Sequence, residues 1–189
     1  MDERIFRIPE RLIERHDTRD PFQLARLLGY YVKFINTKKQ KGFCKIYLNN
    51  YFIFINSNMS LQMQRMTCAH ELGHLLLHKD ALTKRDYLVE MEIFDITDQR
   101  ELEANQFAVN ILIDDEELLE LIQEGNDVVR IASLLNVNVN MLMVKLLTMN
   151  KSGYDFNVPF VPKSAFMGTI EDRADSIKRL SAFPLFFFP

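Results

Sequence analysis

The sequence predicts an α+β fold in which a small antiparallel sheet packs on one helix and a helical C-terminal region follows. Two observations predict it. Three short segments rich in aromatic and β-branched residues follow one another between residues 30 and 55, as neighbouring strands do. After them, apolar residues recur at helical spacing in several segments up to about residue 150.

The composition is that of a globular protein of one core with room for a smaller appended unit, at 189 residues and 48% hydrophobic content. The net charge of −3 shows no overall positive excess, so no direct contact with nucleic acid is expected. Two cysteines, Cys44 and Cys68, exclude a disulfide scaffold and suit a reducing compartment. Neither a signal peptide nor a bilayer-length apolar run is found, so a cytoplasmic protein without membrane contact is expected.

Two helices and three strands are expected in the first third of the chain. The segment 5–16 is amphipathic, and Asp20 followed by Pro21 begins a second helix, because the carboxylate can cap it and proline needs no partner for an amide there. Asn49 and Asn50 form a turn-prone pair, so the last two strands should make a hairpin. The expected strands are Tyr30–Ile35, Phe43–Leu48 and Tyr51–Ile55.

Three of the four histidines lie between residues 66 and 78, and two of them belong to the pattern His70-Glu71-Leu72-Gly73-His74. Because a helix turns by about 100° per residue, His70 and His74 lie one above the other on one face. Two imidazoles at this spacing can bind one Zn²⁺, and Glu71 beside them can take the proton of a metal-bound water. The pattern predicts a zinc-dependent peptidase with Glu71 as general base.

A catalytic zinc ion needs a third protein ligand. The sequence has no histidine six residues beyond His74, and His78 lies too far along the same helix, so a carboxylate from another helix is expected. The helix expected at 98–113 offers Glu101 and Glu103. These side chains point roughly 160° apart and both flank the apolar stripe, so periodicity does not choose between them.

Several alternatives stay open. Two histidines can share a helix face by chance, and a chain with an intact pattern can bind metal or a partner without cutting it. For His78, a place at the helix end or a hydrogen bond just beyond the ligands is favoured. The group that stabilises the oxyanion is not determined, and the candidates are Tyr47, Tyr51, Tyr87 and His78.

The segments Ala69–His78 and Glu103–Ala108 together resemble the ImmA/IrrE family of metallo-endopeptidases. The resemblance covers about residues 20–148 and also includes Leu24–Gly29, Ile53–Asn56 and Ile131–Val137. One departure follows Ala108, where the family has a proline and this chain reads Ile111-Leu112-Ile113-Asp114-Asp115.

The resemblance implies a zincin-like domain in which zinc is bound by His70, His74 and the acid of the Glu-Ala-Asn motif. It therefore favours Glu103 over Glu101 as the third ligand. The family cleaves helix-turn-helix repressors of phage, mobile-element or stress-response genes. The implied partner is such a repressor, and the implied activity is endopeptidase cleavage that relieves repression.

Three parts of the chain are expected. Residues 1–113 form the zinc metallopeptidase domain, and residues 151–189 form an extension, loosely packed or disordered, with a Phe-rich end. Residues 114–150 are helical and resemble a helix-turn-helix. Their last helix offers only Lys145 for phosphate contacts, so packing or substrate recognition is expected there rather than DNA binding.

Overall fold

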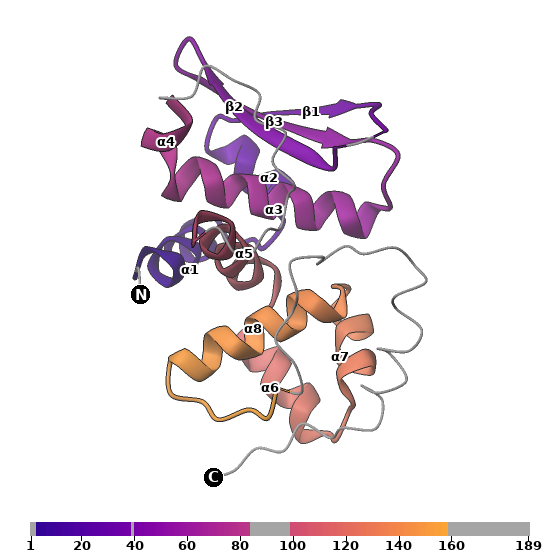
Figure 1. Ribbon diagram of the computed structural model, residues 1–189. Helices are drawn as coiled ribbons and strands as arrows, with labels where there is room; N and C mark the ends of the chain where they lie inside the picture. The colour runs from indigo at the N-terminus through magenta and orange to yellow at the C-terminus, as the bar shows by residue number, and fades with distance from the viewer. Residues whose placement is uncertain (1–2, 39, 84–98, 159–189) are drawn as a thin grey trace. The chain divides into compact units, whose positions relative to one another are not determined.

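The computed structural model describes residues 3–38, 40–83 and 99–158 (Figure 1). The chain divides into two compact units, Met1–Leu112 and Ile113–Pro189. The Phe-rich end, Tyr87 and the residues just before Gln99 lie outside the described residues.

Two helices of the first unit begin where the sequence supplies a capping side chain. The Asp20 side chain accepts a hydrogen bond from the backbone amide of Phe22, with Pro21 as the first helical residue. The Ser60 hydroxyl likewise accepts from the amide of Met63. The helices are α1 (Arg4–His16), α2 (Pro21–Leu27), α3 (Leu61–Leu77), α4 (Lys79–Thr83) and α5 (Gln99–Leu112).

The sheet consists of β1 (Tyr31–Ile35), β2 (Gly42–Tyr47) and β3 (Asn50–Asn56), in the order β1-β3-β2. The strands β2 and β3 form the expected antiparallel hairpin, although its turn residues with positive φ are Leu48 and Asn49 rather than the Asn pair.

The expectation of a wholly antiparallel sheet was wrong, because β1 pairs with β3 in parallel. Strand β3 lies in the centre of the sheet, and its inward side chains Ile53 and Ile55 are completely buried. The connection from β1 to β2 is held across the end of β3, where the Asn56 amide donates to the carbonyls of Thr37 and Gln40. The inward row of apolar side chains on β3 is therefore flanked by the strands on either side of it.

The core lies between the sheet and the helices below it (Figure 1). Helix α3 packs against β2 and β3 on one side and against α5 on the other. It is consequently buried on nearly all sides from Met66 to Leu75, its polar residues included. The apolar residues of this core include Ile53, Ile55, Cys68, Leu72, Leu75, Phe107 and Ile111.

Gly73 allows α3 and α5 to approach closely. A Cβ atom at Gly73 would lie 3.2 Å from the Cα and carbonyl oxygen of Ala104 and 3.1 Å from Cδ1 of Phe107. The two Ala104 atoms belong to the backbone and can retreat only if the helix moves. The small residues at this crossing therefore set the distance between the two helices.

Gly73→Ala is expected to lower the free energy of unfolding by about 1–2 kcal/mol, because overpacking outweighs the better helix propensity of alanine. Denaturant titration measures the change. Zinc affinity should fall as well, since α3 and α5 carry the residues that are expected to bind zinc. A Gly73→Ala variant that is more stable than wild type would show that the helix crossing accommodates a Cβ atom without overpacking.

The second unit contains α6 (Asp115–Gln123), α7 (Val128–Leu134) and α8 (Val139–Lys151). Asp114 caps α6. Asp127 caps α7, and the side chain of the preceding Asn126 donates to the carbonyl of Leu121. No single described helix is both long and apolar enough to cross a membrane, and α7 with α8 meets that test only as a pair bent by 102°.

Candidate metal centre

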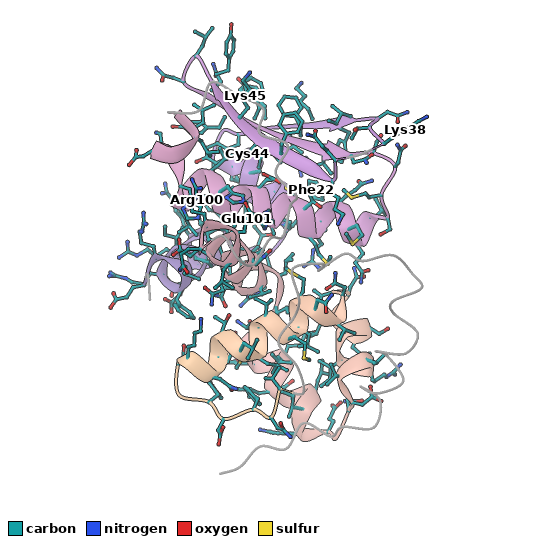
Figure 2. All side chains as sticks on the ribbon, viewed as in Figure 1. Phe22, Lys38, Cys44, Lys45, Arg100 and Glu101 are labelled. Carbon is teal, nitrogen blue, oxygen red and sulfur yellow. The ribbon has the colours of Figure 1, made fainter. Side chains whose placement is uncertain are left out.

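Three buried side chains from two helices converge between α3 and α5. Nε2 of His70 lies 3.0 Å from Nε2 of His74. The two Glu101 oxygens lie 3.2 Å from these nitrogens, Oε2 next to His70 and Oε1 next to His74. His70 and Glu101 are at most 2% exposed and His74 is 8% exposed. Figure 2 places Glu101 at the contact between the two helices.

The choice of Glu103 as the third ligand needs correction, because Glu101 is the acid that reaches the histidines. The Glu103 carboxylate accepts a hydrogen bond of 2.7 Å from Gln99 and lies 3.7 Å from Nε2 of His78. Ala104 and Ala108 face α3, and Glu101 precedes them by three and seven positions, which puts it on the same face. Two positions further on, Glu103 points elsewhere.

The geometry of the cluster fits a zinc ion. Ligands about 2.0–2.1 Å from a tetrahedral zinc ion lie about 3.3 Å from one another. The three pairs of facing atoms are separated by 3.0, 3.2 and 3.2 Å. Two imidazole nitrogens and a carboxylate at such distances can hold a metal ion, and the donor set is one that zinc prefers.

Asn105 orients His70 from behind. Its Oδ1 is an acceptor only and lies 2.9 Å from Nδ1 of His70, so Nδ1 donates and Nε2 is directed at the cluster. Asn105 is completely buried. No role was predicted for this residue from the sequence, although it follows Glu101 by four positions and so shares its helix face.

Asn105→Ala is expected to weaken zinc binding about 10- to 100-fold, because the His70 ring loses the partner that fixes its orientation. Competition with a coloured zinc chelator measures the affinity. Asn105→Asp keeps the acceptor and serves as the matched control, with an affinity closer to wild type. Equal affinities for all three proteins would exclude an orienting role for this side chain.

His78 ends α3 and packs beside the cluster without joining it. Its Nε2 donates a hydrogen bond of 3.1 Å to the carbonyl of Arg100, and its ring centroid lies 5.5 Å from that of His74. Burial lowers the pKa of His78, and the charge of His74 lowers it further. A contact of His78 with a ligand atom, which the sequence suggested, remains a prediction.

Glu71 lies on the side of α3 that faces the sheet, and it is 3% exposed. Both the thiol and the backbone amide of Cys44 in β2 hydrogen-bond to its carboxylate. Gly42 permits this approach, because a Cβ there would lie 2.5 Å from Cγ2 of Thr67 and 3.7 Å from Oε1 of Glu71. The edge strand thus holds the expected general base.

Burial sets the protonation of these groups. It raises the pKa of Glu71 to about 7, although His74 and the Cys44 thiol act in the opposite direction. A carboxylate with a pKa in this range suits general acid–base work near neutral pH. Burial, followed by the charge of Glu71, raises the pKa of the Cys44 thiol well above its usual range, so the thiol stays a donor.

For Glu101, the effects that lower the pKa outweigh the effect of burial. Burial alone would raise its pKa, but hydrogen bonds with His70 and His74 together hold the pKa of this carboxyl well below its usual range. It is therefore an anion in the position where a metal ligand is needed.

A histidine pair on one buried helix, a carboxylate on the next helix and a glutamate beside them define a centre of the metallopeptidase class. The family model Peptidase_M78, described as the IrrE N-terminal-like domain, matches residues 25–147, and the chain belongs to this family. The family assignment and the α+β, zincin-like fold expected from the sequence are confirmed.

One relative is "Uncharacterized immunity region protein 2" of Bacillus phage phi105. It is 37% identical over 107 residues, which are 56% of this chain. The alignment covers 66% of that protein, so the chain spans just under two thirds of its length.

Proposed function

We propose that the protein is a zinc-dependent endopeptidase that hydrolyses a peptide bond in another protein. One observation carries the proposal: the two imidazole nitrogens of His70 and His74 and the carboxylate of Glu101 lie within 3.2 Å of one another inside the fold. Glu71 adjoins this cluster in sequence and is held from the other side by β2. Ligands and base thus come from α3 and α5, and β2 holds the base in place.

The residues have distinct roles. His70, His74 and Glu101 hold the ion, and zinc bound there supplies Lewis-acid polarisation and a water with a lowered pKa. Glu71 accepts the proton of the attacking water and delivers it to the leaving amine. Asn105 keeps His70 aligned, and Cys44 holds the Glu71 carboxylate against the edge strand.

The substrate we propose is a helix-turn-helix repressor in the cytoplasm. The resemblance to the ImmA/IrrE family supports this substrate, and so does a relative whose name places it in a phage immunity region. The reducing conditions of that compartment would also keep the two cysteines as thiols.

A catalytically silent binding module is the second candidate, and DNA binding through residues 126–148 the third. The structure gives a specific observation against DNA binding. Lys145 on α8 is 2% exposed and forms an ion pair with Asp115 of α6. A lysine held inside the helical unit cannot neutralise phosphates, so we assign α7 and α8 to packing or to substrate recognition.

Metal analysis combined with incubation against the repressor encoded beside the gene tests the proposal. About one zinc per chain is expected, together with cleavage that a chelator stops and added zinc restores. Zinc binding without cleavage would favour the silent binding module. Neither zinc nor cleavage under any condition would overturn the proposal.

A further inference from the structure

The sheet has a second face, turned away from α3. Ile53 and Ile55 point into the core, so the alternate residues Phe52 and Phe54 point outward. The residues of β1 and β2 that pair with Phe52 and Phe54 extend this face on both sides of β3. Tyr31 and Lys45 flank Phe52, while Lys33 and Phe43 flank Phe54. We call this the aromatic–lysine face, and it consists of Tyr31, Lys33, Phe43, Lys45, Tyr47, Phe52 and Phe54.

The rings of this face are ordered. Tyr31 and Phe52 stack with centroids 5.2 Å apart, and Phe43 and Phe54 stack at 4.6 Å. Phe52 and Phe54 lie 6.1 Å apart and are tilted by 21°, which joins the two pairs. A groove of about 260 Å³ is lined by Phe52, Phe54, Lys45 and Tyr47. The rings form one nearly parallel series beside an open groove.

The described helices leave this face open. Helices α2 and α3 lie on the other side of the sheet (Figure 1). In Figure 2, Lys45 projects from the outer face, whereas Cys44 is directed toward α3. Tyr31 is 49% exposed and Tyr47 is 59% exposed. Phe43, Phe52 and Phe54 are half-buried between them. A contiguous, partly exposed aromatic surface of this kind is characteristic of a binding surface.

The segment of the chain that forms the sheet is positively charged. Residues 21–70 contain no Asp or Glu and seven Lys or Arg residues, while the rest of the chain holds 16 basic and 26 acidic residues. The net charge of −3 therefore conceals a segment of charge +7 that includes the entire sheet. Lys33, Lys38 and Lys45 of this segment are exposed. The expectation drawn from net charge alone overlooked this asymmetry.

We propose that the aromatic–lysine face binds single-stranded nucleic acid. Bases stack on aromatic side chains whatever their sequence, and lysines next to the rings neutralise the phosphates between them. Duplex DNA fits less well, because this sheet offers no element that enters a groove. An acidic peptide would use the lysines but gain little from a series of parallel rings. This inference does not depend on the proposed peptidase activity.

Fluorescence anisotropy of a labelled 20-nucleotide oligo(dT) with the full chain tests the proposal. Saturable binding is expected at 50 mM salt, weaker by roughly 7- to 20-fold at 200 mM if two or three phosphates are neutralised. Phe52→Ala should weaken binding roughly 5- to 100-fold through lost stacking. Because this ring also packs on its neighbours, Lys33→Gln and Lys45→Gln provide a second test with exposed residues.

The control is Lys151→Gln, which removes an exposed lysine from the other unit and should bind as wild type does. No binding at 50 mM salt would overturn the proposal, as would binding that the Lys33, Lys45 and Phe52 variants leave unchanged. Equal competition by duplex DNA or by a poly-glutamate peptide would also contradict it. Failure to bind, with a change of oligomeric state in Phe52→Ala by light scattering, would instead assign the face to contacts between copies.

Discussion

Glu71→Gln is expected to abolish peptide hydrolysis while the zinc content stays that of wild type. Glutamine has the same shape but cannot accept the proton of the attacking water, and removing general-base catalysis costs about 10²- to 10⁴-fold in rate. Zinc is retained because the ligands are His70, His74 and Glu101. Cleavage of the repressor and metal content are measured on the same preparation.

The structure also predicts the effect of this change on folding. The backbone amide of Cys44 can donate to the side-chain carbonyl of a glutamine as it does to the carboxylate of Glu71, so the substituted side chain should stay in place. The melting temperature is expected not to fall, because a buried ionisable group is replaced by a neutral one. Cleavage at the wild-type rate by Glu71→Gln would refute the assigned mechanism.

Glu101→Gln is expected to remove zinc, with Glu103→Gln as the matched control. Both changes replace the same acid on the same helix, two positions apart. Only Glu101 contacts both histidines, whereas Glu103 bonds to Gln99 and lies beside His78. Loss of one of three protein ligands should lower zinc affinity by at least about 100-fold, more than loss of a group beyond the ligands does.

The affinities are measured by chelator competition and the stabilities by thermal unfolding with and without zinc. Wild type and Glu103→Gln should gain stability from added zinc, since a ligand that binds only the folded state raises its stability. Glu101→Gln should gain little. The opposite pattern, with zinc lost from Glu103→Gln and kept by Glu101→Gln, would restore the ligand set that the Glu-Ala-Asn motif suggested.

The histidine pair and the base could be predicted because one helix carries them. The period of α3 alone puts His70 and His74 on one face, with Glu71 next to them. The third ligand could not be chosen in this way. Which side of α5 faces α3 depends on the close crossing at Gly73 and Ala104, and that crossing is a property of two helices packed together.

For the strands, too, local sequence predicted where each element lies but not which element it pairs with. Their positions follow from residue types, but the parallel pairing of β1 with β3 joins segments about twenty residues apart and was missed. The contact of Cys44 with Glu71 depends on that arrangement, because it brings β2 to the edge beside α3. Sequence patterns therefore predicted each strand, but they did not determine which strand or side chain it contacts.

Diffraction recorded at the zinc absorption edge from crystals of the zinc-loaded protein tests the central claim most directly. We expect one anomalous peak within about 2.2 Å of Nε2 of His70, Nε2 of His74 and an oxygen of Glu101. A peak coordinated by Glu103 or His78 instead, or no peak between α3 and α5 after loading, would contradict the account.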